Sequence, residues 1–298
     1  MPSPIEGAAL DHVAVAVERW SDAWPRYAVA LGGAWHSGGL NVGFGPAQLG
    51  YANGGRVEVL QPWRPEDNPF LRRFLDRHGP GPHHMTFKVP DLAGALDTAR
   101  SRGWEPVGVD LENPQWKEAF LHPRQATGIV VQLAQSNHDW ATAPAEGFPL
   151  KRNAAAAFVR ITHAVADLAG SLTLFEGLLG ATVLAEGAGP EGSWRYVDLA
   201  WARAPQLRLV APAEGAPVLD DWLGRRPGRL HHLAFAMPAA VDGSWPEEGG
   251  GSSANPSPAP SAGVLPADWA TAVVEPQDNL GTRLVLLREE ARGPRGLG

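Results

Sequence analysis

Two histidines at matching places of an internal repeat are the residues of this chain best suited to chemistry. The segment 83–89, HHMTFKV, aligns without a gap with the segment 11–17, DHVAVAV, so His84 corresponds to His12. Each histidine begins a run in which large apolar residues alternate with small or polar ones, the pattern of a half-buried strand. Two such strands paired about a pseudo-twofold axis would point both imidazoles into one cavity. Because neutral imidazole is a common metal ligand, the repeat predicts a metal site.

Two further residues complete a set of candidate ligands. Glu58 lies in RVEVLQPW and Gln132 in GIVVQLAQ, two predicted strands at equivalent places of the repeat. The chain has no cysteine, so any metal must be held by nitrogen and oxygen. We therefore predict that His12, Glu58, His84 and Gln132 bind one divalent ion. Two imidazoles, a carboxylate and an amide oxygen suit Ni²⁺, Co²⁺, Zn²⁺, Mn²⁺ or Fe²⁺, and ligand type alone does not choose among them.

A longer repeat shows that only one half of the chain keeps this set. The segment 216–232, APVLDDWLGRRPGRLHH, aligns without a gap with the segment 68–84, NPFLRRFLDRHGPGPHH. At the places of the four candidate ligands, the second half has Arg160, Arg208, His232 and Val285. Arginine repels a cation and valine cannot bind one, so we expect no metal in the second half. This half either supports the first structurally, or its two arginines form an anion-binding pair.

Composition limits the classes of partner. The 298 residues, 44% of them hydrophobic, are enough for two domains with ordinary cores. A net charge of −7 gives no basic surface for nucleic acid. The sequence contains neither a secretory signal nor an apolar run of roughly 18 residues, the length that a membrane span requires. We expect a cytoplasmic protein, monomeric or homodimeric, whose partner is a small-molecule substrate.

The elements that must position the ligands can be predicted from the same alternation. In the first half it predicts strands at 9–17, 42–51, 56–61, 83–89, 118–122 and 128–134. Ser21 is predicted to cap a helix that ends at Leu31, and Asp91 to cap a second helix that ends at Gly103. In the second half, Asp167 is predicted to cap the corresponding helix.

Two stretches carry no such pattern. Residues 137–157, rich in alanine and interrupted by proline, are predicted to link the two domains. Residues 241–264 are rich in glycine, serine and proline, and we predict a disordered or mobile loop there.

Four strings of this sequence resemble a known superfamily: LDHVAVAV, RVEVLQPW, GPHHMTFKVPDLAGALDTARSRG and EAFLHPRQATGIVVQLAQ. They are similar to the vicinal oxygen chelate superfamily, which includes glyoxalases, bleomycin resistance proteins and dioxygenases, and most of all to methylmalonyl-CoA epimerases. The resemblance implies an α+β fold with two tandem glyoxalase-like domains, at 8–136 and 158–290. Each domain would pair two βαβββ units into a cupped mixed sheet with helices outside. The ligands would come from the first and last strand of each unit.

The resemblance also implies a reaction. In epimerases and glyoxalases of this superfamily a metal holds a carbonyl or enolate oxygen while a carboxylate removes the adjacent carbon-bound proton. Relatives usually carry a carboxylate at the place of Gln132, and an amide cannot take a proton. We therefore predict that Glu58 is the base, with Glu118 or a water as a second base, and that Lys117 is a candidate substrate anchor.

The sequence is compatible with three functions. The first is a metal-dependent isomerase or lyase that abstracts a proton next to a metal-bound carbonyl. The second is a non-haem Fe(II) ring-cleaving dioxygenase, in which His12, His84 and one carboxylate hold the iron. The third is a metal-free small-molecule binding protein of the resistance type. The sequence does not identify the substrate.

Overall fold

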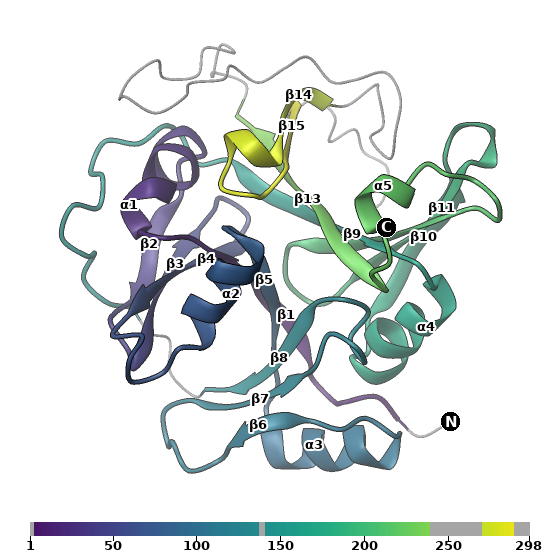
Figure 1. Ribbon diagram of the computed structural model, residues 1–298, viewed down its shortest axis with the longest axis horizontal. Helices are drawn as coiled ribbons and strands as arrows, with labels where there is room; N and C mark the ends of the chain where they lie inside the picture. Colours follow the sequence, from purple (N-terminus) through teal and green to yellow (C-terminus); the bar gives the residue numbers. More distant parts are fainter. Residues whose placement is uncertain (1–2, 137–140, 239–269, 289–298) are drawn as a thin grey trace. The chain divides into compact units, whose positions relative to one another are not determined.

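The strands of this protein form two mixed β-sheets (Figure 1). The computed structural model describes residues 3–136, 141–238 and 270–288. The strands of the first sheet are β1 (Ala9–Ala16), β2 (Ala34–Gly38), β3 (Gly43–Gly50), β4 (Arg56–Trp63), β5 (Gly81–Lys88), β6 (Val107–Asp110), β7 (Lys117–Leu121) and β8 (Val130–Gln135). Those of the second are β9 (Ala157–Val165), β10 (Thr182–Ala188), β11 (Trp194–Ala200), β12 (Gln206–Pro212), β13 (Gly228–Met237), β14 (Ala270–Val274) and β15 (Leu284–Arg288).

The strand order reproduces the internal repeat. It is β2-β3-β4-β1-β5-β8-β7-β6 in the first sheet and β10-β11-β12-β9-β13-β15-β14 in the second. In each half of a sheet, the first strand of the repeat lies at the centre and the last strand lies beside it. Both sheets contain parallel and antiparallel pairs, so the predicted α+β class with mixed sheets is confirmed.

The helices are few and short. They are α1 (Trp20–Ala23), which continues as a π-helical segment (Trp24–Ala30), α2 (Phe70–His78), α3 (Leu92–Ser101), α4 (Leu168–Leu172), which continues as a π-helical segment (Thr173–Leu178), and α5 (Asp220–Leu223). Two 3₁₀ turns cover Pro190–Gly192 and Pro276–Asp278.

The alternation within the strands decides which side chains enter the core. β5 and β8 are parallel neighbours, with Met85 beside Val131 and Phe87 beside Leu133. These four side chains have no exposed surface. The residues between them point to the opposite face of the sheet, which is where the candidate ligands lie.

Two predicted helix starts needed a correction. Ser21 is not the cap of the first helix: α1 begins one residue earlier, and the backbone N–H of Trp20 donates to Gln61 Oε1 at 2.9 Å. A side chain of β4 thus serves the purpose predicted for Ser21. Asp91 does occupy the N-cap position of α3, but its side chain makes no capping hydrogen bond. There the N–H of Leu92 donates to Gln135 Oε1 on β8, at 2.9 Å.

The third predicted cap is confirmed. Asp167 precedes α4, and its carboxylate accepts a hydrogen bond from the backbone N–H of Gly170 at 3.0 Å. Such a bond satisfies one of the N–H groups that have no partner within the helix.

The chain also divides into two compact units: one of Met1–Ala14, His83–Trp140 and Arg160–His231, the other of Val15–Pro82, Ala141–Val159 and His232–Gly298. Each unit takes strands from both sheets. The predicted domain limits at 8–136 and 158–290 therefore stay a prediction, as does the role of 137–157 as a linker.

The predicted loop at 241–264 lies outside the described residues. In the described part of the chain, no helix combines the length and the apolar character that crossing a bilayer requires.

Candidate metal centre

The four predicted ligands lie on four consecutive strands of the first sheet. Glu58 is on β4, His12 on β1, His84 on β5 and Gln132 on β8, and these strands are neighbours in that order. All four residues are buried, with exposed fractions between 0% for His12 and 7% for Glu58. The sheet order alone thus brings together residues that are far apart in the sequence.

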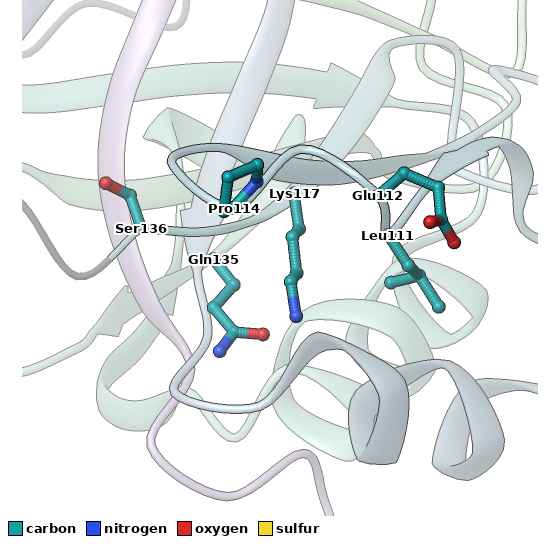
Figure 2. Close-up of a pocket in the computed structure, with 6 residues that line it drawn as sticks. All are labelled: Leu111, Glu112, Pro114, Lys117, Gln135 and Ser136. Carbon is teal, nitrogen blue, oxygen red and sulfur yellow. The ribbon is translucent and has the colours of Figure 1, made fainter.

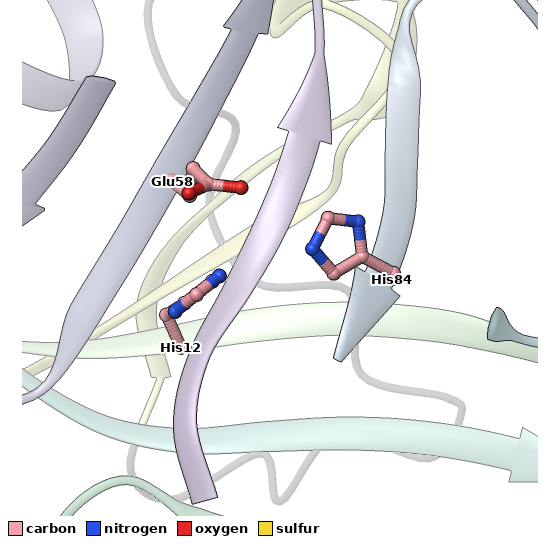
Figure 3. A group of neighbouring side chains, drawn as sticks. All are labelled: His12, Glu58 and His84. Carbon is pink, nitrogen blue, oxygen red and sulfur yellow. The ribbon is translucent and has the colours of Figure 1, made fainter. Parts of the chain in front are cut away.

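Three of these side chains could hold a metal ion. One ligand atom from each of His12, Glu58 and His84 lies within 4.8 Å of the others. Figure 3 shows the carboxylate of Glu58 and the two imidazoles directed toward one another. The ring centroids of the two histidines are 5.8 Å apart, with an angle of 67° between the ring planes. The predicted proximity of His12 and His84 is thus present in the structure.

A neighbouring carboxylate sets the protonation of one imidazole. Nδ1 of His12 lies 2.8 Å from Oδ2 of Asp11, and both residues are buried. An ionised carboxylate only accepts hydrogen bonds, so Nδ1 of His12 must carry the proton and donate. The lone pair of His12 is therefore on Nε2, which is buried. Metal-binding histidines are commonly oriented by a carboxylate in this way.

The second imidazole has a histidine as its partner. Nδ1 of His83 lies 2.8 Å from Nδ1 of His84, so one ring donates and the other accepts. When His84 donates, its buried Nε2 keeps a lone pair that is available to an ion. Each of the two histidines is therefore contacted at Nδ1 by the residue that precedes it, His12 by Asp11 and His84 by His83.

The fourth predicted ligand is held by hydrogen bonds on both ends of its amide. Gln132 Oε1 accepts from Thr86 Oγ1 at 2.6 Å, and Gln132 Nε2 donates to Glu118 Oε2 at 2.7 Å. The amide oxygen has two lone pairs, so the bond from Thr86 leaves one for another partner. The same oxygen of Glu118 also accepts from Trp116 Nε1 at 2.8 Å. Gln132 and Glu118 are therefore fixed relative to each other.

The carboxylate of Glu58 also has a positioned neighbour. Gln48 lies directly opposite Glu58 in the antiparallel pair β3 and β4. Its Nε2 donates to Glu58 Oε1 at 3.2 Å, and both side chains are buried. Gln48 was not recognised from the sequence, although its cross-strand place follows once the hairpin of β3 and β4 is known.

The ligand face of the sheet also carries a lysine of β5. Lys88 aligns with Ala134 across β5 and β8, so it shares a face with Gln132. Its Nζ lies 3.8 Å from the ring centroid of Trp116, a cation–π contact. Lys117 aligns with Gln135 across β7 and β8, and so points to the other face.

Lys117 lines a separate hollow of about 270 Å³ (Figure 2). The residues around this hollow are Leu111, Glu112, Pro114, Lys117, Gln135 and Ser136. Gln135 is the residue that receives the first N–H of α3, so the hollow lies on the helix side of the sheet. The role of Lys117 as a substrate anchor stays a prediction.

The first sheet is thus built from two βαβββ repeats and carries two histidines and a carboxylate on adjacent strands. Residues 11–120 match the family model of the Glyoxalase/Bleomycin resistance protein/Dioxygenase superfamily. For these residues the match confirms the resemblance found in the sequence. It includes three of the four predicted ligands and ends before Gln132.

Solved structures extend the similarity to most of the chain. A mutant of 4-hydroxymandelate synthase from Streptomyces coelicolor is 17% identical over 80% of this chain and 72% of its own, with a TM-score of 0.57. At this identity the likeness shows the fold alone, and that fold is consistent with the predicted pair of tandem glyoxalase-like domains.

Two shorter structures also align. Methylmalonyl-CoA epimerase from Mycobacterium tuberculosis is 24% identical, over 46% of this chain and 93% of its own, with a TM-score of 0.41. A hypothetical protein from Bacillus halodurans is 22% identical, over 47% of this chain and 100% of its own, also with a TM-score of 0.41. At these TM-scores neither structure carries an argument. Comparison with curated proteins gave no match.

Proposed function

We propose that this protein is a metal-dependent isomerase or lyase that removes a proton next to a carbonyl group of a small-molecule substrate. The observation that carries the proposal is the group His12, Glu58 and His84, whose ligand atoms lie within 4.8 Å of one another. The match of residues 11–120 supports an enzyme of this kind, because the matching superfamily includes both glyoxalases and dioxygenases.

The residues present fit a divalent ion. Two imidazoles and one carboxylate form a nitrogen and oxygen set of the kind that borderline metals prefer. The hydrogen bond from His12 Nδ1 to Asp11 leaves Nε2 of His12 unprotonated, as a metal ligand must be. Gln132 is proposed as a fourth ligand through the amide oxygen that Thr86 also contacts. The donor set does not distinguish Ni, Co, Zn, Mn and Fe.

When bound, the ion would act as a Lewis acid that lowers the energy of negative charge on a substrate oxygen. The protein itself would supply the base. Glu58 is the candidate, because its carboxylate lies among the ligands and is oriented by the bond from Gln48. Glu118 is the candidate second base, held on the same face by Gln132 and Trp116. Gln132 has no carboxylate and takes no proton.

Lys88 is the proposed anchor for an anionic group of the substrate. It lies on β5, four residues after His84. Every second side chain of a strand points to the same face, so Lys88 and His84 share the ligand face. A lysine at this place can attract a carboxylate or phosphate toward the site by charge. Its ammonium group lies over the ring of Trp116, which precedes β7.

A second candidate function rests on the composition of the same group. Two histidines and one carboxylate are the protein ligands of many non-haem Fe(II) oxygenases. Because Gln132 is an amide, the set has a single carboxylate, as the pattern of two histidines and one carboxylate requires. A ring-cleaving dioxygenase is therefore the alternative, and a metal-free binding protein is the third outcome of the test below.

The test is a comparison of proton exchange with oxygen uptake. Protein loaded with Co²⁺, Ni²⁺, Zn²⁺, Mn²⁺ or Fe²⁺ is incubated in D₂O with a panel of 2-substituted acyl thioesters and 2-oxo compounds. Mass spectrometry follows deuterium in the substrate, and an oxygen electrode follows O₂. We expect deuterium exchange that Glu58→Gln abolishes and that Glu66→Gln, the same change at an exposed glutamate, retains. If oxygen is consumed only by the Fe²⁺-loaded protein in the presence of substrate, the protein is a dioxygenase. If it binds none of the metals, it is a metal-free binding protein.

A further inference from the structure

The second sheet carries two arginines where the first sheet carries metal ligands. Arg208 on β12 lies beside Thr162 on β9, and Arg160 lies two residues before Thr162. Side chains two residues apart in a strand share a face, and so do direct neighbours in adjacent strands. Arg160 and Arg208 therefore project from the same face of the sheet.

Only one of the two guanidinium groups has an acidic partner. Arg208 donates through Nε and Nη2 to the two carboxylate oxygens of Asp198, at 2.7 and 2.6 Å, and its guanidinium lies 4.2 Å from the ring centroid of Tyr196. Both members of this ion pair are buried, at 7% exposure. In the described part of the chain no carboxylate pairs with Arg160, and its buried Nε has no hydrogen-bond partner.

The electrostatics of Arg160 reflect this imbalance. Burial, and after it the charge of Arg208, lowers the pKa of Arg160 to about 10. At neutral pH the side chain is still charged, so the pair of arginines and Asp198 carry a net charge of +1. A guanidinium that is partly removed from water beside a second one is unfavourable unless an anion compensates the charge.

We propose that Arg160 and Arg208 form a binding site for a small oxyanion, the carboxylate or phosphate group of a ligand, on the second sheet. Guanidinium groups match these anions in shape and donate two parallel hydrogen bonds to them. Asp198 holds Arg208 in place and accepts hydrogen bonds from its Nε and Nη2. The remaining N–H donors of Arg208 and the N–H donors of Arg160 can then bind an anion. Arg160 is only partly buried, so an anion can reach it. The site is independent of the proposed metal centre, and its proposal does not rest on that function.

The experiment measures thermal unfolding of the full chain in potassium phosphate, potassium acetate and potassium chloride at equal ionic strength. Binding to the folded state alone raises the unfolding midpoint, by about 5 °C when the anion is at roughly a hundred times its Kd. We expect such a rise in phosphate or acetate but not in chloride. A rise in phosphate alone indicates a phosphate group, and a rise in acetate indicates a carboxylate.

Two matched variants assign the effect to this site. Arg160→Gln should abolish the rise. Arg195→Gln should retain it, because Arg195 is an exposed arginine of β11 whose side chain points to the face opposite Asp198. Arg160→Lys keeps the positive charge but lacks the planar guanidinium that donates two parallel hydrogen bonds. It replaces the glutamine variant if that variant does not fold. We expect it to bind the anion at least roughly tenfold more weakly, as measured by calorimetry. An equal rise in chloride, or a rise unchanged in the Arg160 variants, would overturn the proposal.

Discussion

The bond between Asp11 and His12 gives the sharpest prediction about the metal centre. Asp11→Asn keeps the size and shape of the side chain but removes its charge. In the wild-type protein Asp11 Oδ2 lies 2.8 Å from His12 Nδ1, and the two residues are 8% and 0% exposed. The substitution therefore removes the negative charge from the acceptor of this bond and keeps an oxygen that can accept it.

The expected size follows from the nature of that bond. A hydrogen bond to a charged group contributes about 1.5 to 3 kcal/mol, and a neutral one about 0.5 to 1.5 kcal/mol. Losing the charge should therefore cost about 1 to 1.5 kcal/mol of metal-binding free energy, or roughly tenfold in Kd. This is the lower end of the effect usually seen when a residue that orients a metal ligand is changed.

The assay is a competition titration of Co²⁺ between the protein and a chromogenic chelator at pH 7. The control is Asp97→Asn, the same change at a side chain that is 82% exposed and pairs with Arg100 on the surface of α3. We expect the Kd to rise about tenfold in the first variant and to stay at the wild-type value in the control. Equal Kd values for the two variants would refute the role given to Asp11.

Three further predictions concern stability. His163 is fully buried, and burial lowers its pKa to about 4; because the unfolded state takes up a proton near pH 6.5, stability should fall by up to roughly 3 kcal/mol between about pH 6.5 and pH 4. Urea midpoints against pH should show this loss in the wild type and little of it in His163→Gln. Asp198→Asn leaves the buried charge of Arg208 without its partner and should cost about 3 to 5 kcal/mol in urea unfolding at pH 7; a loss under about 1 kcal/mol would contradict this. Phe87→Ala empties a core position with no exposed surface and should cost about 3 to 5 kcal/mol by the same measurement.

Much of the fold could be predicted because its signals are local. The alternation around His12 and His84 fixed both the strands and the face of each histidine, since successive side chains of a strand point to opposite sides. The repeat then gave the pairing of those strands without any knowledge of distances. Asp167 was predicted as a cap for a similar reason: a cap contacts residues that follow it directly in the chain.

The predictions that needed correction or addition depend on contacts between distant segments. Gln61 takes the place predicted for Ser21 only because β4 lies beside the start of α1. Lys88 lies on the ligand face and Lys117 on the opposite face, which depends on how β5 and β7 pair with β8. The bond of Asp11 to its neighbour depends on a side-chain rotamer, which no sequence pattern records.

The metal content of this chain after equilibrium dialysis against each candidate ion tests the proposed metal centre most directly. We predict one divalent ion per chain, lost in His12→Ala and in His84→Ala and retained in His78→Ala, a change at an exposed histidine at the end of α2. Circular dichroism of each variant would show that the fold persists. A protein that binds no ion, or that keeps its ion in both His12→Ala and His84→Ala, would contradict the account.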